Sequence, residues 1–139
     1  MAQMERFSIT IPKELSAAFD ARNQKRGYGN RSEAIRDLIR EALVKEEWSN
    51  PREKVAATVT LVYDHHTRML TDKITEVQHD HGDLIVSALH VHLDHHNCLE
   101  VIVLRGRAGE VRALADNLSA IRGVKHAQVT LATEGKSLV

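Results

Sequence analysis

The first 45 or so residues are predicted to form one strand and two helices, too little structure to bury its own apolar surface. Residues 5–11 alternate between apolar and polar side chains, as in a half-buried strand. The apolar face consists of Phe7, Ile9 and Ile11, and the polar face consists of Arg6, Ser8 and Thr10. We therefore expect this segment to exist only as a dimer, in which two copies of the strand pair as an antiparallel ribbon above four helices.

Two helices follow the strand and are separated by a glycine-containing turn. The first is predicted to open at Pro12, where the missing N–H costs nothing, and to end at Gly27-Tyr28-Gly29. The second is predicted to begin near Asn30, because Glu33 follows three residues later in a capping-box pattern, with Ser32 as an alternative cap. Its apolar stripe consists of Ala34, Ile35, Leu38, Ile39, Ala42 and Leu43.

The second half of the chain is predicted to follow the order βαββαβ, after a polar linker at residues 50–54 that contains a proline. The predicted strands are residues 55–63, 84–93, 98–104 and 124–132, and the predicted helices are residues 67–80 and 109–121. This order is that of the ferredoxin-like fold, in the compact ACT-type form of small regulatory domains. The predicted fold class is therefore α+β, with an N-terminal domain at 1–49 and a C-terminal domain at 55–139.

Composition and charge limit the class of protein. Of the 139 residues 42% are hydrophobic, which indicates a globular chain, and 19 basic residues balance 19 acidic ones. Residues 1–54 carry 11 Lys and Arg against 9 Asp and Glu, and their cluster at Arg22, Lys25, Arg26 and Arg31 is weak support for a phosphate-facing surface. No apolar run is long enough to span a membrane, no signal segment is visible and there is one cysteine, so we expect a cytoplasmic protein.

All nine histidines lie after residue 64, and two of them alternate just before the only cysteine. His90 and His92 are separated by one residue on a predicted strand, which puts their side chains on one face with Cα atoms roughly 7 Å apart. Cys98 returns on the next strand as a sulfur ligand. Imidazole with thiolate favours Ni, Cu or Zn over Mg or Ca, because hard cations prefer oxygen donors.

The strand pattern predicts which face holds this cluster. Leu99, Val101 and Val103 are the expected core face, so His90, His92 and Cys98 are expected on the opposite, non-core side. Glu100 is close enough there to orient an imidazole. The alternative is that the histidines are ordinary solvent-facing residues and Cys98 a small buried side chain. A fourth ligand stays open, within the chain or from another subunit, among His65, His66, His79, His81, His95 and His96.

Two segments resemble the nickel-responsive regulator family (NikR-type), in which a ribbon-helix-helix repressor is fused to a ferredoxin-like metal-binding domain. They are residues 26–37, Arg-Gly-Tyr-Gly-Asn-Arg-Ser-Glu-Ala-Ile-Arg-Asp, and residues 89–100, with Gln78-His79 upstream. The resemblance implies one square-planar Ni²⁺ per subunit, bound by His90, His92 and Cys98 of one chain and His79 of another. It also implies a homotetramer, a dimer of dimers, that represses nickel-uptake genes when nickel is abundant.

The same resemblance implies the DNA-binding residues. Arg6, Ser8 and Thr10 would enter the major groove of operator DNA with palindromic half-sites, and Asn30, Arg31 and Ser32 would hold backbone phosphate, with Arg68 as a further contact. Glu33 and Asp37 resemble carboxylates of a secondary cation site between the domains. The chain departs from the family at residues 79–83, His-Asp-His-Gly-Asp, where a longer histidine run is usual.

Two other functions compete with a metal-dependent repressor. Nine histidines also suit a metal storage or delivery protein, which would need no polar ribbon face at Arg6, Ser8 and Thr10. A metalloenzyme is disfavoured, because no general base is evident beside an open coordination position. We therefore expect a regulator without catalytic residues.

Overall fold

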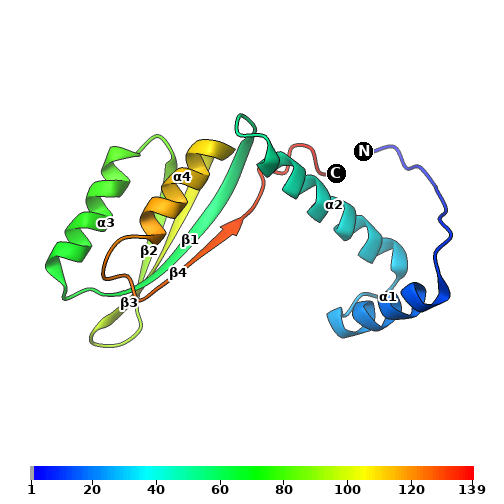
Figure 1. Ribbon diagram of the computed structural model, residues 1–139, viewed down its shortest axis with the longest axis horizontal. Coiled ribbons are helices and arrows are strands. Elements are labelled where there is room, and N and C mark those ends of the chain that lie inside the picture. Colours follow the sequence, from blue (N-terminus) through cyan, green and yellow to red (C-terminus); the bar gives the residue numbers. More distant parts are fainter. Residues whose placement is uncertain (1) are drawn as a thin grey trace. The chain divides into compact units, whose positions relative to one another are not determined.

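The computed structural model describes residues 2–139 and divides into two compact units. The first comprises the described residues up to Leu43 together with Ser137–Val139, and the second is Val44–Lys136. Figure 1 shows helix α1 and most of α2 in the first unit, and the sheet with α3 and α4 in the second. Among residues 2–139, no helix combines the length and the apolar character needed to cross a membrane.

The first helix, α1 (Lys13–Arg26), lies within one residue of its predicted bounds. Pro12 is its N-cap residue and not the first helical residue. The helix ends at Gly27, whose φ of +78° lies in the left-handed region that glycine adopts without strain. This conformation turns the Gly27 N–H back to the carbonyl oxygens of Asn23 and Gln24, which closes the last turn of the helix.

The second helix, α2 (Arg31–Ser49), begins where the capping pattern predicts. Asn30 Oδ1 accepts a hydrogen bond of 2.9 Å from the backbone N of Glu33, so Asn30 and not Ser32 makes this cap. Residues 2–12, before α1, are exposed and form no strand within the single chain. A ribbon requires a second chain, so the predicted strand pairing stays a prediction.

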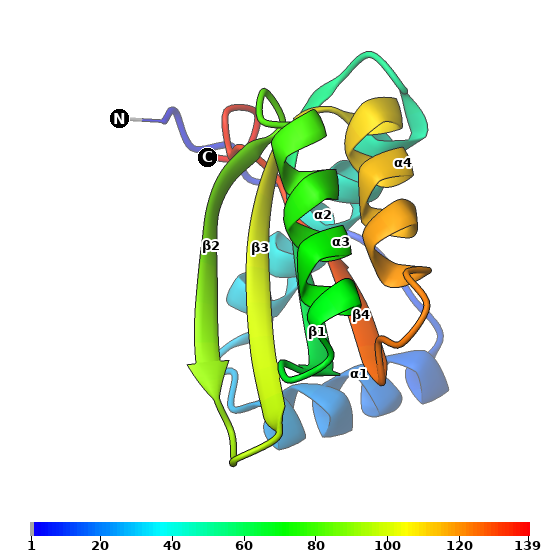
Figure 2. The ribbon, with the colours of Figure 1, turned by 90° about the vertical axis from the view of Figure 1, so that its left-hand side faces the viewer.

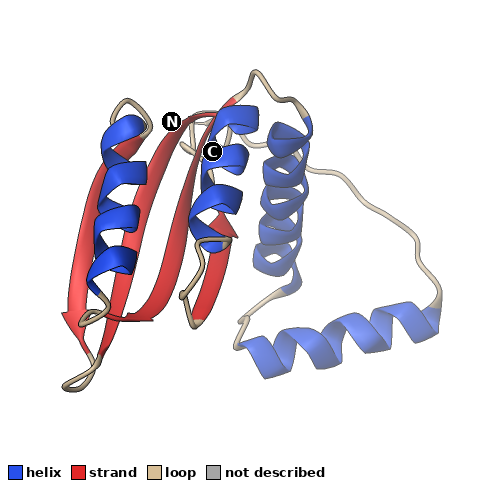
Figure 3. Cartoon of the chain, turned by 60° about the vertical axis from the view of Figure 1, so that its left-hand side comes forward, coloured by secondary structure: helices blue, strands red, loops and turns tan. Residues whose placement is uncertain are grey.

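The second unit is a four-stranded antiparallel sheet of order β2-β3-β1-β4 with two helices on one face (Figures 2 and 3). Its elements are β1 (Lys54–Asp64), α3 (Arg68–Asp80), β2 (Ile85–His92), β3 (Asn97–Arg107), α4 (Ala108–Ser119) and β4 (His126–Leu131). The predicted βαββαβ order is confirmed. Both central strands, β1 and β3, are longer than the edge strands.

A single core lies between the sheet and the two helices. From the sheet it takes the buried alternate residues Val55, Ala57, Val59, Leu61 and Tyr63 of β1 with Cys98, Ile102 and Leu104 of β3. From the helices it takes Leu70, Ile74 and Val77 of α3 with Val111, Leu114, Ala115 and Leu118 of α4. The alternate residues of the strands and the apolar residues at helical spacing therefore pack together in one layer.

The predicted core face of β3 is wrong. Leu99, Val101 and Val103 lie on the face away from the helices and are only half-buried, whereas Cys98 and Glu100 are on the covered face. Alternation determines which side chains share a face but does not say which face the helices cover. Because β3 carries apolar residues on both faces, the buried carboxylate of Glu100 made the covered face look like the polar one.

The end of α2 belongs to the second unit. Trp48 is 7% exposed, and its indole Nε1–H donates a 2.8 Å hydrogen bond to the carbonyl oxygen of Ala132. The guanidinium of Arg112 lies 5.3 Å from the centre of the indole ring. The predicted linker is also attached to the second unit, because Pro51 O and Glu53 O accept hydrogen bonds from the first residues of α4. The only tryptophan of the chain is thus a probe of this unit.

Candidate metal centre and DNA-binding surface

Strands β2 and β3 place three predicted metal ligands on one face of the sheet. His92 pairs with Cys98 and His90 pairs with Glu100 in the antiparallel register, so all four side chains point to the same side. Cys98 Sγ lies 3.8 Å from His90 Nδ1. Cys98 is 1% exposed, whereas both histidines are exposed because β2 is an edge strand. The predicted grouping of these residues on one face is confirmed, although that face is the helix-covered one.

Glu100 lies in the core next to these residues and contacts His90. Its side chain is fully buried, and each carboxylate oxygen accepts hydrogen bonds. Oε2 accepts a 2.7 Å bond from the Tyr63 hydroxyl, and Oε1 accepts a 2.8 Å bond from Gln78 Nε2 and lies 3.1 Å from His90 Nε2. A buried carboxylate is costly unless it is satisfied in this way. The predicted orienting role of Glu100 toward an imidazole has this contact as its structural support.

The contact to Glu100 also selects one nitrogen of His90 for a metal. With Nε2–H directed at the carboxylate, Nδ1 is the free acceptor, and it is the nitrogen that faces Cys98 Sγ. Burial, followed by the hydrogen bond to Glu100, raises the pKa of Tyr63, so its hydroxyl stays protonated and remains a donor. Tyr63 and Gln78 thus fix the carboxylate of Glu100, which in turn orients His90.

The donor set fits a transition metal. Metal–sulfur and metal–nitrogen bonds of about 2.3 and 2.0 Å put neighbouring donor atoms roughly 3–3.5 Å apart, and the Cys98–His90 separation of 3.8 Å needs only a small adjustment. Thiolate and imidazole suit nickel, copper and zinc. His79, the fourth predicted ligand, is exposed near the end of α3, on a different element from the other three.

The predicted DNA-binding residues lie in the first unit, except for Arg68, which begins α3 in the second unit. Arg6, Ser8 and Thr10 are exposed along residues 2–12, and Ser32 is exposed in the first turn of α2. The Asn30 side chain is used as the cap. Arg31 makes a two-pronged ion pair with Asp20, with Nε–Oδ1 and Nη2–Oδ2 distances of 2.7 and 2.6 Å. This pairing lowers the pKa of Asp20, and an arriving phosphate must compete with that carboxylate.

The carboxylates predicted for a secondary cation site have partners within α2 and the preceding turn. Asp37 accepts hydrogen bonds from the Tyr28 hydroxyl at 2.7 Å and from Arg40 Nη1 at 2.9 Å, and the Tyr28 bond lowers the pKa of Asp37 most. Glu33 forms an ion pair with Arg36 one turn along the helix. A cation bound there would compete with Arg36 and Arg40 for these carboxylates.

The sequence places Tyr63 at the end of the predicted strand 55–63 and indicates no further role for it. The one available signal is that a buried phenol needs a hydrogen-bond partner. Gln78 entered only through the family resemblance, and its contact with Glu100 could not be expected from helical spacing. These two residues show that the support of a metal ligand is harder to find in a sequence than the ligand.

Comparison with known proteins decides the family. Residues 56–132 match the profile of the NikR C terminal nickel binding domain, and residues 5–46 match that of the ribbon-helix-helix protein, copG family. This chain belongs to the nickel-responsive regulator family. Proteins of Geobacter sulfurreducens and Geobacter metallireducens described as nickel-responsive regulators are each 54% identical to it over 138 residues, covering 99% of both chains.

A solved structure supports the fold of the nickel-binding domain of this regulator. An uncharacterized protein of Thermotoga maritima superposes with a TM-score of 0.51 at 19% identity, covering 57% of this chain and 98% of that one. That likeness concerns the fold alone. Membership of the family establishes a nickel-responsive DNA-binding regulator, which acts on operator DNA and is not an enzyme. The storage or delivery alternative is therefore not retained.

Proposed function

We propose that this regulator represses nickel-uptake genes, and that nickel bound between subunits strengthens its binding to the operator. Each subunit would bind one Ni²⁺ through His90, His92 and Cys98, with His79 supplied by another chain. The observation that supports the proposal is that one chain brings together three of the four predicted ligands and leaves the fourth on a separate helix. Glu100 contacts His90, and His90 Nδ1 lies 3.8 Å from Cys98 Sγ, yet β2 is an exposed edge strand and His79 is exposed on a separate helix.

The uncovered face of the sheet supports a tetramer. On β2, Leu89 and Val91 are 61% and 41% exposed, and the half-buried Val101 and Leu99 of β3 pair directly with them. An apolar sheet face of this kind is stable when a second sheet covers it. We therefore propose that sheets from two chains meet there, which joins two ribbon dimers into a dimer of dimers.

The apolar side chains of residues 2–12 support the ribbon dimer. Phe7 and Ile9 are 63% and 64% exposed in the single chain, and pairing two strands would bury them above α1 and α2. The opposite side of that ribbon would present Arg6, Ser8 and Thr10 to the major groove, where arginine suits a guanine edge. The start of α2, at Asn30, Arg31 and Ser32, would hold phosphate, and Glu33 with Asp37 would serve a secondary cation.

Nickel would act by linkage. A ligand set divided between chains is complete only in one arrangement of the tetramer, so nickel has a higher affinity for that arrangement. If that arrangement also spaces two ribbons for two half-sites, nickel and operator must strengthen each other by the same factor. Cys98 must lose its proton to bind metal, so nickel affinity should fall as the solution is acidified.

Operator binding with and without nickel tests the proposal. DNA duplexes are selected from a random library with the nickel-loaded protein, and their affinity is then measured by fluorescence anisotropy. We expect nickel to tighten binding at least 100-fold, Cys98→Ala to abolish this response, and His126→Gln, an exposed histidine of β4, to retain it. A nickel response that survives in Cys98→Ala would show that the assigned centre is wrong.

Mixed tetramers test whether the centre is shared between subunits. His79→Ala and Cys98→Ala chains each lack a ligand, but a shared centre between them contains one complete set. Unfolding and refolding the two variants together should therefore restore part of the nickel binding that each variant alone lacks. No restoration in tetramers shown by mass spectrometry to be mixed would place all four ligands in one chain.

A further inference from the structure

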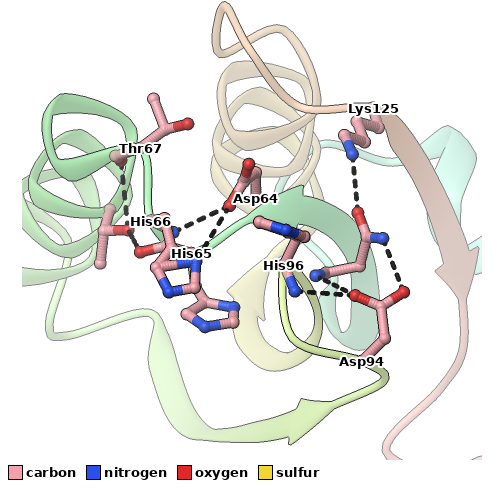
Figure 4. A network of polar contacts seen from close by, with 9 residues as sticks. Asp64, His65, His66, Thr67, Asp94, His96 and Lys125 are labelled. Carbon is pink, nitrogen blue, oxygen red and sulfur yellow. Dashed lines mark hydrogen bonds and ion pairs between the residues drawn. The ribbon is translucent and has the colours of Figure 1, made fainter.

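We propose a second metal site, separate from the Cys98 centre, in which Asp64, His66 and His96 bind a divalent first-row transition metal such as Ni²⁺ or Zn²⁺. One ligand atom from each of these residues lies within 4.8 Å of those of the other two. Asp64 is the last residue of β1, His66 lies in the turn from β1 to α3, and His96 lies in the turn from β2 to β3, and these segments meet at one end of the sheet (Figure 4).

The backbone holds these two loops together without a metal. Asp64 pairs with Asn97 at the end of the β1–β3 ladder, and the next residue, His65, donates its backbone N–H to His96 O at 3.1 Å. The separation of His66 from His96 is therefore determined by strand register, although the two residues are thirty positions apart in the chain. A site prearranged in this way loses little conformational entropy when metal binds.

Hydrogen bonds within each loop limit their movement further. Asp64 Oδ1 accepts a 2.9 Å bond from the backbone N of His66. Asp94 Oδ1 accepts bonds of 2.8 and 2.7 Å from the backbone N of His96 and of Asn97. Figure 4 shows both turns with Lys125, whose Nζ donates to Asn97 Oδ1 at 2.7 Å. Only Oδ1 of Asp64 is used by these contacts, so Oδ2 is available to a cation.

An unusual concentration of imidazole rings surrounds the three residues. The ring of His66 lies 4.3, 5.1 and 5.4 Å from those of His65, His95 and His96. His65 Nδ1 is buried and has no hydrogen-bond partner. Four adjacent imidazoles repel one another when protonated and gain little from solvent-exposed ring contacts. His66 Nδ1 lies 3.7 Å from Asp64 Oδ1, beyond hydrogen-bond distance, so a shared metal ion would give this arrangement a stronger interaction.

The donor set determines the class of metal. Two imidazoles and one carboxylate favour nickel, zinc, copper or cobalt over magnesium or calcium, which prefer all-oxygen sites. There is no thiolate, and His66 and His96 are exposed, so water would complete the coordination. We therefore expect weaker binding than at the Cys98 centre and occupancy only at higher free metal.

Counting bound nickel while observing the thiolate separates the two sites. The full-length protein is dialysed against rising free Ni²⁺, total bound metal is measured by mass spectrometry, and the sulfur-to-nickel charge-transfer absorption reports Cys98 alone. We expect the wild type to bind two Ni²⁺ per chain. The double variant His66→Gln/His96→Gln should bind one with its charge-transfer band unchanged, and Cys98→Ala should bind one without that band.

Two further variants make the result decisive. His126→Gln, an exposed histidine outside the cluster, should still bind two Ni²⁺ per chain. Asp64→Asn keeps an oxygen that accepts the His66 N–H but loses the charge, so it should weaken the second site at least tenfold even if the double variant folds poorly. One Ni²⁺ per wild-type chain at saturation, or two in the double variant, would overturn the proposal without affecting the Cys98 assignment.

Discussion

The two units of this regulator differ in how much apolar surface each can bury alone. In the second unit Leu61, Ile102 and Leu118 are completely buried between sheet and helices. Among the described residues up to Leu43, only Ala34 and Asn23 are buried. The second unit therefore has a complete core and leaves its candidate metal centre open, whereas the first has two helices that need further apolar contacts.

Because of this difference, the two units would gain different things from association with another chain. For the first unit, association would supply the core, because Phe7 and Ile9 of the predicted strand and Leu38 and Leu43 of α2 are at least 37% exposed. For the second unit, the core is complete within one chain, and in the proposed tetramer a partner chain would add only a ligand and a cover for the exposed sheet face. Mutations in the two units should consequently affect different measurements.

The largest expected effect on stability comes from the core of the second unit. Ile102→Ala removes a fully buried side chain and should lower the free energy of unfolding by about 2–5 kcal/mol. Trp48 belongs to the same core, so its fluorescence during urea titration of the metal-free protein measures the change. Ile9→Ala serves as the matched control and should leave this transition where it is. Equal shifts in the two variants would show that the units do not differ in this way.

A charge in the apolar face of the ribbon should instead prevent the first unit from forming a dimer. Burying an isoleucine side chain is worth about 1.5–3 kcal/mol, and a dimer contains two copies. Ile9→Asp is therefore expected to weaken dimerisation of the apo-protein by at least 100-fold and to abolish operator binding. Sedimentation velocity measures the association state, and Trp48 fluorescence should show an unchanged second unit. A variant that keeps both its dimer and its DNA affinity would exclude the proposed ribbon.

Much of the fold could be predicted because its signals are local. Asn30 and Gly27 mark helix ends through their own hydrogen bonds and backbone angles, and the alternation from His90 to Cys98 correctly predicted side chains on one face. The covered face of β3 could not be predicted, because Leu99 and Ile102 are both apolar and lie on opposite faces. The choice between them depends on where the helices pack, which is not a local property.

The supporting parts of the candidate sites were missed for a related reason. Tyr63 and Glu100 are 37 residues apart and meet only because β1 pairs with β3. His66 and His96 become neighbours through the same pairing. A motif along the chain predicts ligands on one strand or across a short hairpin, but it does not predict contacts between strands that are far apart in the sequence.

A smaller change should distinguish support of the metal ligand from general stability. Tyr63→Phe removes the 2.7 Å hydrogen bond to Glu100 and should weaken nickel binding about 10-fold, because groups that orient metal ligands contribute roughly that much. Tyr28→Phe removes a hydrogen bond of equal length, to Asp37 in the first unit, and should leave nickel affinity unchanged. Competition with a chelator of known affinity gives both values. Equal losses in the two variants would contradict the role of Tyr63.

The smallest expected effect concerns the turn between β2 and β3. Hydrogen bonds to Asp94, first from the Asn97 side chain and then from backbone N–H groups, lower the pKa of this carboxyl from 3.8 to about 2. Because the folded pKa is the lower one, the stabilisation is complete above pH 3.8 and is lost as the pH falls toward 2. Amide exchange at His96 and Asn97, measured by NMR, should therefore accelerate over that interval beyond its intrinsic pH dependence. In Asp94→Asn, which keeps an acceptor oxygen but does not titrate, this additional acceleration should disappear, and its persistence would place the titrating group elsewhere.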